Sequence, residues 1–165
     1  MAVRPIRLYP DPILKHPTTL ICLTDPALSD WVQDLLDTLE ASPGVALAAP
    51  QIGCPVRMIV VDVTRKKGAR GHGLVVLINP RVLRQDGPRV VREGCLSVPD
   101  YTGNVRRFER TVVEGTSPDG RVVILNTSGF EAQAYQHEID HLEGTLFLDR
   151  LDSLSTDLFR RKVNR

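Results

Sequence analysis

The stretch Gln136-His137-Glu138-Ile139-Asp140-His141 holds the strongest structural and chemical signal in this 165-residue chain. Histidines four residues apart lie on one face of an α-helix, so both imidazoles can reach a single cation. A glutamate directly after the first histidine is placed to take a proton from water bound to that cation. The stretch therefore predicts a metal-binding helix with its own general base.

The flanking residues predict the limits of this helix. Ser128 and Glu131 have the spacing of a capping box, with Ser128 as the N-cap and Glu131 reaching back to it. Gly144 lies just past the pattern and is expected to end the helix. One stripe of the helix would carry Phe130, Ala134, His137, Glu138 and His141. The side chains expected to lean away from this stripe are Gln133, Gln136 and Asp140.

A catalytic metal site of this kind usually has three protein ligands and one open position for water. Because His141 is the last histidine, a ligand from farther along the chain would be a carboxylate, from Glu143, Asp149 or Asp152. Cys95, in the run Glu93-Gly94-Cys95-Leu96-Ser97, is the stronger candidate. It follows the strand-like residues 89–92, and a thiolate at a strand end could meet the helix to complete a Cys/His/His set.

The other two cysteines, Cys22 and Cys54, are expected to be buried small apolar residues. Three cysteines are an odd number for a disulfide framework, and the N-terminus shows no charged-then-apolar leader. Both observations favour a reducing compartment.

A run of mostly small residues, Gly44-Val45-Ala46-Leu47-Ala48-Ala49-Pro50-Gln51-Ile52-Gly53, forms a further motif. One interpretation is a flexible connector between the expected helix Leu28–Ala41 and the expected strand Val56–Val63. The other is a substrate site, because small side chains let an extended peptide approach the backbone closely. Gln51 is the only side chain in the run able to donate a hydrogen bond to a reacting oxygen.

Together, GVALAAPQ at 44–51, EGCLS at 93–97 and QHEIDH at 136–141 resemble the three signature motifs of the peptide deformylase family. They occur in the family's order and at comparable spacing. Asp11–Leu14, Ile78–Pro80 and Leu146–Arg150 are also similar to family features, so the resemblance covers nearly the whole chain. It implies a metal-dependent hydrolase that removes the formyl group from the N-terminal formylmethionine of nascent polypeptides and releases formate.

The resemblance also implies catalytic roles for single residues. Cys95, His137 and His141 would bind the metal, with water in the fourth position as the nucleophile. Glu138 would be the general base and then the acid that protonates the leaving amine. The Gln51 side-chain amide and the Leu96 backbone N–H would form the oxyanion hole.

Substrate contacts are implied in the same way. Backbone groups of Gly44, Val45, Ala46 and Gly94 would hold the peptide as an added strand. Val45, Phe130 and Ala134 are the candidates for the pocket of the methionine side chain. The chain departs from the family at Ala46, where glycine is common, and we expect the alanine to be tolerated if its backbone angles suit it.

A thiolate with two imidazoles suits several divalent metals, so the ligand set does not choose between them. The resemblance implies Fe²⁺ in the cell, with Zn²⁺, Ni²⁺ or Co²⁺ able to occupy the site in a preparation. Glu93 and Asp140 would orient ligands or an arginine such as Arg106 or Arg107. The alternative for these two acids is an ordinary surface or loop ion pair.

Short β-rich segments fill the middle of the chain, and Ser117-Pro118-Asp119-Gly120 is a strong turn signal that predicts a hairpin. The order of elements predicts one α+β domain over residues 1–165. Antiparallel β-sheets would wrap around the central metal-binding helix, with an N-terminal helix at Leu28–Ala41 and a short C-terminal helix. The expected strands are Val56–Val63, Leu74–Asn79, Val82–Gln85, Arg110–Gly115 and Arg121–Asn126.

The composition, with 42% hydrophobic and 25% charged residues, is ordinary for a soluble globular protein. A net charge of +1 gives no reason to expect direct nucleic-acid binding. A membrane helix needs about 20 consecutive apolar residues, and no apolar stretch of the sequence is near that length. These features predict a cytoplasmic protein without a membrane contact.

The segment Leu154–Arg165 combines apolar Leu154, Leu158 and Val163 with basic Arg160, Arg161, Lys162 and Arg165. In some members of the family that the chain resembles, a basic C-terminal helix docks on the ribosome near the peptide exit. A transient ribosome contact is therefore one hypothesis for this segment. The alternative is a basic helix end that complements its own dipole.

Two other functions compete with deformylation. A small metallopeptidase would cut internal peptide bonds, but the upstream cysteine and the EGCLS run argue against it. A degenerate relative would only bind formylated peptides or carry structural zinc. The presence of both Glu138 and Gln51 argues against that, because a structural site needs neither a base nor an oxyanion donor.

Overall fold

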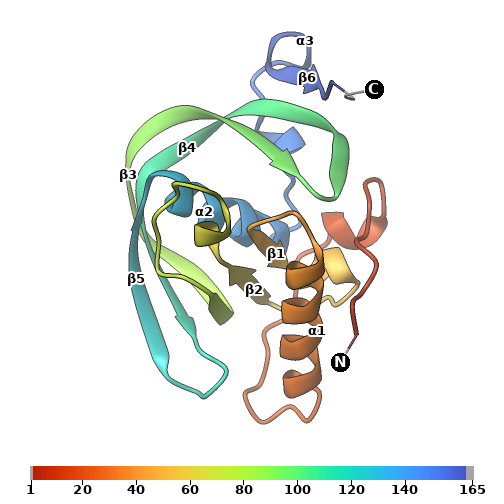
Figure 1. The fold of residues 1–165 in the computed structure, drawn as a ribbon, viewed down its shortest axis with the longest axis vertical. Helices are drawn as coiled ribbons and strands as arrows, with labels where there is room; N and C mark the ends of the chain where they lie inside the picture. The colour runs from red at the N-terminus through yellow and green to blue at the C-terminus, as the bar shows by residue number, and fades with distance from the viewer. Residues whose placement is uncertain (1, 163–165) are drawn as a thin grey trace.

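An antiparallel β-sheet curves around one buried helix in the computed structural model, which describes residues 2–162 (Figure 1). The strands follow the order β1-β2-β3-β4-β5, and β6 pairs with β4. Their bounds are β1 Ala46–Ala48, β2 Met58–Val61, β3 Val75–Cys95, β4 Val98–Thr116, β5 Val122–Ser128 and β6 Leu158–Arg160. The helices are α1 Leu28–Ala41, α2 Gly129–Leu142 and α3 Leu154–Asp157, with short 3-10 helices at Pro12–Lys15, Ala49–Ile52, Val63–Arg65 and Phe147–Arg150. The predicted α+β class is confirmed.

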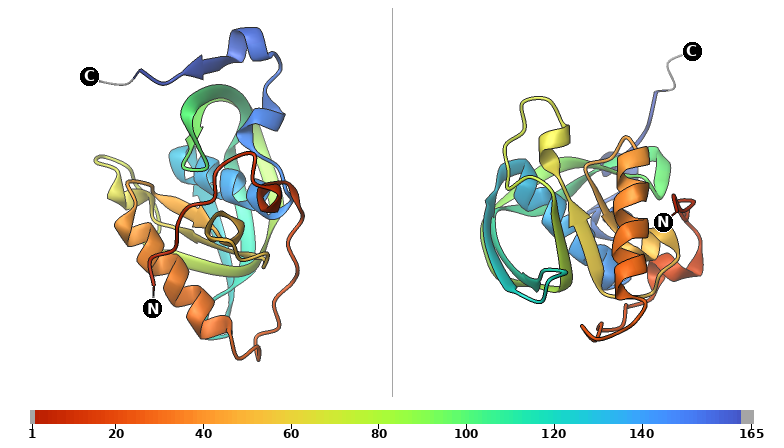
Figure 2. Two further views of the ribbon diagram at one scale, coloured as in Figure 1. Left: turned by 90° about the vertical axis from the view of Figure 1, so that its right-hand side faces the viewer. Right: turned by 60° about the horizontal axis from the view of Figure 1, so that its bottom comes forward.

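β3 and β4 form a long hairpin that bends over α2 (Figures 1 and 2). The segments Leu74–Asn79 and Val82–Gln85, which the sequence predicts as separate strands, run together into β3. The pairing with β4 shifts its register around Pro80. Asn79 has a φ of 51°, and its side-chain amide bonds both the N–H and the C=O of Ile21 at 2.9 Å. The sheet thus accommodates the proline by a bulge instead of ending the strand.

The turn Ser117-Pro118-Asp119-Gly120 joins β4 to β5, as its composition predicts. The Ser117 N–H donates to the Arg121 carbonyl at 2.9 Å. Gly120 has a φ of 88°, a left-handed conformation that favours glycine. The predicted hairpin is confirmed.

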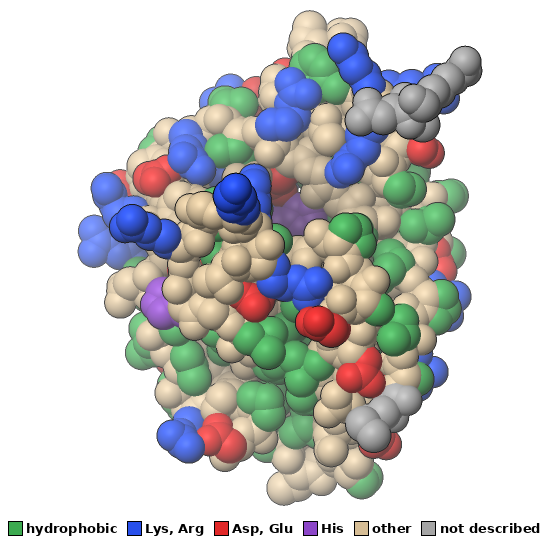
Figure 3. Space-filling view, in the orientation of Figure 1, with side chains coloured by type: hydrophobic (Ala, Val, Ile, Leu, Met, Phe, Trp, Pro, Cys, Tyr) green, Lys and Arg blue, Asp and Glu red, His purple; other side chains and the backbone are tan. Residues whose placement is uncertain are grey.

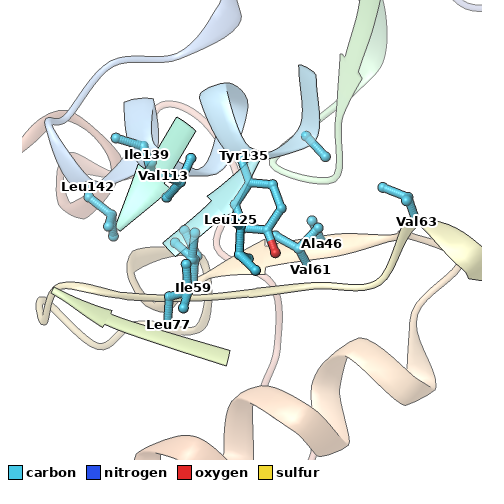
Figure 4. Close-up of a cluster of buried hydrophobic side chains, with 12 residues drawn as sticks. Ala46, Ile59, Val61, Val63, Leu77, Val113, Leu125, Tyr135, Ile139 and Leu142 are labelled. Carbon is cyan, nitrogen blue, oxygen red and sulfur yellow. The ribbon is translucent and has the colours of Figure 1, made fainter. Parts of the chain in front are cut away.

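The hydrophobic core fixes α2 against the inner face of the sheet (Figure 4). Its buried side chains come from β1 to β5, from α2 and from the 3-10 helix Val63–Arg65, and none is more than 9% exposed. Burial of each large apolar side chain contributes about 1.5–3 kcal/mol, so this cluster holds the helix firmly in place. The main members are Ile59, Val61, Leu77, Val113, Leu125, Tyr135, Ile139 and Leu142.

Burial of α2 extends to all of its sides. Every residue from Glu131 to Leu142 is buried, including the side chains predicted to lean away from the metal-binding stripe. Gln136, for example, accepts from the Phe108 N–H at 2.8 Å and donates to the Phe108 carbonyl at 2.9 Å. Such partners are required of buried polar groups. The polar residues of this helix therefore contact β4 and the loops inside the protein and do not form a solvated face.

The predicted capping box at the start of α2 is wrong. Ser128 is the N-cap, but its side chain makes no capping hydrogen bond. Glu131 instead accepts from the His72 backbone N–H at 2.8 Å and contacts the His72 imidazole at 2.9 Å. The Glu131 carboxylate is therefore hydrogen-bonded by the loop before β3, and not by the first turn of α2. The other end follows the prediction, because Gly144 has a φ of 71° and donates its N–H to the His141 carbonyl at 3.1 Å.

The N-terminal helix α1 has the predicted bounds and buries Leu28, Leu35 and Leu39. The expectation for the cysteines outside the motif is wrong for Cys22, which is exposed, and Cys54 is only half-buried. Cys22 lies in the loop before α1, where local sequence does not reveal which side chains the neighbouring segments cover.

Up to Lys162, the C-terminal segment is helical only over the four residues of α3. Arg160 lies in β6, which pairs with Tyr101–Gly103 of β4, and Arg161 and Lys162 follow it. A basic helix end that complements its own dipole is therefore wrong for these residues. Val163 and Arg165 lie outside the described residues.

Between residues 2 and 162, no helix combines the length and the apolar character needed to cross a lipid bilayer.

Candidate metal centre and active site

Cys95, His137 and His141 come together where β3 ends beside α2. One ligand atom of each residue lies within 4.8 Å of the other two. The Cys95 Sγ is 3.3 Å from the His141 Nε2, and the two imidazole centroids are 5.0 Å apart. In a tetrahedral site with metal–ligand distances of about 2.0–2.3 Å, ligand atoms lie about 3.3–3.8 Å from one another. The donor set and its spacing fit one divalent cation.

The carboxylates downstream of the helix are engaged elsewhere in ion pairs at the surface. Glu143 pairs with Arg57 at 2.6 Å, and Asp152 pairs with Arg106 at 2.9 Å. Asp149 pairs with Lys15. Within the described part of the chain, none of the three acids joins the Cys/His/His group.

The charges around the three candidate ligands favour a thiolate. Burial disfavours ionisation of the Cys95 thiol, but the charges of His141 and His137 outweigh it and hold the pKa of Cys95 well below its ordinary value. Burial also disfavours a charged His137, and the Glu93 carboxylate raises the pKa of His137 well above its ordinary value. Metal ligands must be deprotonated, so a cation bound here would take the place of the proton that these charges favour on His137.

Glu138 lies next to His137 on α2 and lines the cavity beside the three candidate ligands. It is 4% exposed, and burial raises its pKa to about 7 against the opposing charges of His137 and His141. Its Oε2 has no hydrogen-bond partner among the described residues. Burial of an unpaired carboxylate oxygen is costly unless a polar group meets it. Glu138 is thus placed to bind a polar group or a proton inside the cavity.

Both ends of the Gln51 side-chain amide are fixed. Its Oε1 accepts from the Ala48 N–H at 2.9 Å, and its Nε2 donates to the Ser97 Oγ at 3.1 Å. The Nε2 is also 3.6 Å from the Cys95 Sγ. The amide therefore holds its N–H₂ group toward the candidate ligands. Leu96, whose backbone N–H is the other expected oxyanion donor, lines the same cavity.

These residues border an open cavity of about 400 Å³. Figure 3 shows a hollow on this face of the molecule, with a histidine at its floor and Lys and Arg side chains around it. His141, at 1% exposure, is the one predicted site residue that does not line the cavity. Those that do are Gly44, Val45, Ala46, Gln51, Gly94, Cys95, Leu96, Phe130, Ala134, His137 and Glu138.

The strand β1 is the edge of the sheet next to this cavity. Among the described strands it pairs with β2 alone, so its other edge can pair with an extended peptide. Ala46 lies in this strand at 9% exposure. Asn79 is the one non-glycine residue in the described range with a positive φ, so the backbone at Ala46 does not require glycine.

A chain of buried charges supports His137. Glu93 contacts the His137 Nδ1 and accepts from Arg107 at 2.7 and 2.9 Å. Arg107 is 3% exposed and donates to Asp140 at 2.6 Å. Asp140 in turn accepts from Arg150 at 2.6 Å. Although burial opposes it, the charges of His137 and Arg107 hold the pKa of Glu93 at about 2.

This network distinguishes the two arginines that the sequence leaves as alternatives. Arg107 is buried between Glu93 and Asp140, whereas Arg106 makes an exposed pair with Asp152. The two acids are therefore not simple surface ion pairs. Glu93 fixes the orientation of the His137 ring, and Arg107 fixes Glu93.

A family model for polypeptide deformylase matches residues 3–157. The chain belongs to the polypeptide deformylase family. It is 44% identical to a peptide deformylase of Syntrophobacter fumaroxidans over 162 residues, which cover 98% of this chain and 94% of the relative.

Solved structures of polypeptide deformylases share the fold. A peptide deformylase from Legionella pneumophila is similar with a TM-score of 0.84 at 35% identity, over 93% of this chain and 88% of that chain. The Met-Ala-Ser-bound class I type b peptide deformylase from Acinetobacter baumannii is similar with a TM-score of 0.84 at 32% identity, over 91% of this chain and 100% of that chain. The family expected from the three motifs is confirmed.

Polypeptide deformylases are metal-dependent hydrolases that remove the N-formyl group from nascent peptides. Membership in this family makes the chain an enzyme, and its Cys/His/His group is compatible with metal binding.

Five residues of the cavity wall have no counterpart in the site expected from the sequence: Pro43, Lys66, Arg92, Gln133 and Arg161. Gln133, which was expected to lean away from the metal-binding stripe, lines the cavity instead. Arg92 could have been predicted from the sequence. Residues two apart on a strand share a face, and Gly94 was an expected substrate contact. Lys66 belongs to a basic loop with no pattern of its own. Arg161 reaches the cavity only through the pairing of β6 with β4, which no local pattern predicts.

Proposed function

We propose that residues 1–165 form a single catalytic domain that removes the formyl group from the N-terminal formylmethionine of nascent polypeptides and releases formate. The observation that carries the proposal is the meeting of three chemical features in one cavity. A Cys/His/His group lies beside a buried, unpaired carboxylate oxygen of Glu138 and the fixed amide of Gln51. Family membership supports the reaction.

Cys95, His137 and His141 are the residues that would hold the metal. A divalent cation bound there would supply an activated water molecule at neutral pH and polarise the formyl carbonyl. We propose Fe²⁺ as the metal in the cell, with Zn²⁺, Ni²⁺ or Co²⁺ able to replace it in a preparation, because the thiolate and imidazoles suit all four.

Glu138 is the proposed general base and acid. It takes a proton from the attacking water and passes it to the amine that leaves, so that a formamide and water give formate and a free N-terminus. Its pKa of about 7 suits a group that must both accept and donate a proton near neutral pH. Proton transfer by a positioned side chain contributes roughly 100- to 10,000-fold to the rate.

Gln51 and Leu96 are the proposed oxyanion donors. The Gln51 amide is already fixed by Ala48 and Ser97, so little reorganisation is needed when negative charge develops on the formyl oxygen. Loss of one such donor typically costs about 3–4 kcal/mol of transition-state stabilisation.

The free edge of β1 is the proposed binding site for the peptide backbone, with Gly44, Val45, Ala46 and Gly94 beside it. Val45, Phe130 and Ala134 form the proposed pocket for the methionine side chain. The Acinetobacter baumannii relative is described as bound to Met-Ala-Ser, a peptide that begins with methionine. This supports a peptide of the same kind as the ligand of the present cavity.

Product analysis separates this proposal from the competing functions. A peptide with formylmethionine at its start and several internal peptide bonds is incubated with the metal-loaded protein, and the products are identified by mass spectrometry. Besides formate, we expect a single peptide product, in which a hydrogen replaces the formyl group and all internal peptide bonds are intact. Internal cleavage would indicate a metallopeptidase, and binding without any product would indicate a degenerate relative.

Cys95→Ser replaces the proposed thiolate ligand by a hydroxyl, which is a weaker ligand for these metals. We expect metal affinity to fall by at least about tenfold, measured by competition with a chelator. Cys54→Ser, at a half-buried cysteine outside the cavity, is the control and should keep its metal. Unchanged affinity in Cys95→Ser would remove Cys95 from the metal site.

The basic C-terminus is proposed to make a transient ribosome contact in the cytoplasm, where formylated chains emerge. Arg160 and Lys162 are exposed and lie beyond the core of the domain. Neutralising both, as Arg160→Gln with Lys162→Gln, should weaken co-sedimentation with ribosomes while leaving Arg161 in place. Equal co-sedimentation of the variant and the unchanged protein would refute the contact.

A further inference from the structure

Three cations border the active-site cavity on its outer side. We call them the basic rim: Lys66 from the loop before β3, Arg92 from β3, and Arg161 from the segment after β6. All three are exposed, in contrast to the buried residues of the Cys/His/His group. Lys and Arg side chains around the hollow are visible in Figure 3.

Two of the rim cations rest on aromatic rings. The Lys66 Nζ lies 4.3 Å from the centroid of the Phe130 ring, and the Arg92 guanidinium lies 3.6 Å from the centroid of the Phe159 ring. Cation–π contacts of this kind hold a charged group in place without neutralising it. The positive charge therefore stays available at the cavity mouth.

Arg161 is positioned by backbone pairing. The strand β6 pairs with Tyr101–Gly103 of β4, and the Arg161 N–H donates to the Asp100 carbonyl at 2.8 Å. Its guanidinium lies against Gly94, where a Cβ would be only 2.2 Å from the Arg161 Nη2. Gly94 is one of the proposed backbone contacts of the substrate. Arg161 thus lies directly beside the path proposed for the peptide.

Among the described residues, the rim cations have no acidic partner, whereas many other arginines have one. Between residues 2 and 162, Arg81, Arg106 and Arg110 each pair with a carboxylate, but no residue of the basic rim does. The cavity wall does contain Glu93 and Glu138, which are 5% and 4% exposed. Glu93 is already bonded to Arg107 and His137.

We propose that the basic rim recognises an acidic side chain within the first three residues after formylmethionine, and that Arg161 is the main determinant of this preference. The inference rests on the proposed function, which places the formyl group at the floor of the cavity. Because an extended peptide advances about 3.3–3.6 Å per residue, the next few residues must leave past the rim. A substrate carboxylate there would give the three cations an acidic partner that none of the residues 2–162 provides.

The proposed main determinant, Arg161, lies at the margin of the region that the family model describes. The family match ends at residue 157, before β6 and Arg161. Lys66 and Arg92 lie inside the matched range, as do the residues proposed to recognise the formyl group, so of the rim only Arg161 lies beyond it.

The test compares pairs of amidated formylmethionyl peptides that carry either Glu or Gln at the second, third or fourth position. Amidation removes the terminal carboxylate, so only the side chain differs. At low ionic strength we expect the Glu peptide to have the higher kcat/KM at one or more positions, by about three- to tenfold. The difference should lie in KM, because the rim is remote from the reacting atoms, and it should shrink as salt screens the charges.

Two matched charge reversals locate the effect. Arg161→Glu should bring the Glu-to-Gln ratio of kcat/KM below one. Arg160→Glu makes the same change in net charge one residue earlier, at the last residue of β6 and outside the cavity lining, and should keep the ratio within about twofold of the unchanged protein. A ratio near one for the unchanged protein at all three positions, or equal ratios in the two variants, would overturn the proposal.

A binding measurement separates this inference from the proposed function. Fluorescence anisotropy of labelled Glu and Gln peptides reports their affinities for the metal-loaded Glu138→Gln protein without turnover. Selective binding of the Glu peptide, with no formate from the unchanged protein, would refute deformylation but uphold the rim. Formate release from both peptides at equal KM would refute the rim and uphold deformylation.

Discussion

Glu138→Ala is expected to lower kcat/KM for a formylmethionyl peptide by at least 100-fold, and by up to about 10,000-fold, while the metal stays bound. The carboxylate is the group placed to move the proton between water and the leaving amine, and it is not one of the three candidate ligands. Formate release at a measured metal-to-protein ratio checks this expectation. The metal measurement is essential, since a protein that had lost its metal would be inactive for another reason.

Glu143→Ala provides the matched control. Glu143 follows α2 by one residue and is 54% exposed, in an ion pair with Arg57. Its removal should change kcat/KM by less than about twofold, because exposed pairs contribute little. If Glu138→Ala kept more than a tenth of the activity at full metal content, another group would have to be the base.

Arg107→Ala is expected to destabilise the folded protein by about 3–5 kcal/mol, because it leaves the Glu93 and Asp140 carboxylates buried without their shared partner. Its effect should extend to the metal. Glu93 orients His137, and loss of such support typically lowers metal affinity by about 10- to 100-fold. Urea denaturation of the metal-free protein and chelator competition on the metal-loaded protein measure the two effects separately.

The neighbouring Arg106→Ala is the natural comparison. Arg106 carries the same charge on the next residue of β4, but its pair with Asp152 is exposed to solvent. We expect a change of at most about 1 kcal/mol in stability and no change in metal affinity. Similar losses in the two variants would mean that the buried network does not support the metal site.

Local sequence patterns predicted the elements that local interactions determine. The apolar spacing of α1 located its bounds, and the turn residues at Ser117-Pro118-Asp119-Gly120 located the β4–β5 hairpin. The histidine spacing on α2 placed His137 and His141 on one face. In each case the determining residues are close together in sequence.

The features that sequence reasoning missed depend on partners far along the chain. Glu131 bonds His72 instead of capping α2, because the loop before β3 folds over the start of the helix. Cys22 is exposed although its neighbour Ile21 is buried, and the packing of distant segments decides which of the two is covered. Arg161 reaches the cavity because β6 adds to β4. None of these contacts leaves a periodic or composition signal in a single sequence.

The candidate site divides in the same way. Cys95, His137 and Glu138 belong to motifs whose residue types predict their chemical roles. The residues that orient them could not be predicted in this way, since only the structure distinguishes buried Arg107 from exposed Arg106. The role of Ser97 also follows from the structure alone, where its hydroxyl accepts a hydrogen bond from the Gln51 amide.

Formate release is the measurement that tests the central claim most directly. The protein is purified without oxygen, stripped of metal, and reloaded with Fe²⁺ or Ni²⁺ to a measured occupancy. It is then given formyl-Met-Ala-Ser and acetyl-Met-Ala-Ser in parallel. We predict formate from the formyl peptide only when metal is present, and no acetate from the acetyl peptide. Absence of formate at full metal occupancy would contradict the assignment of this cavity as a deformylase active site.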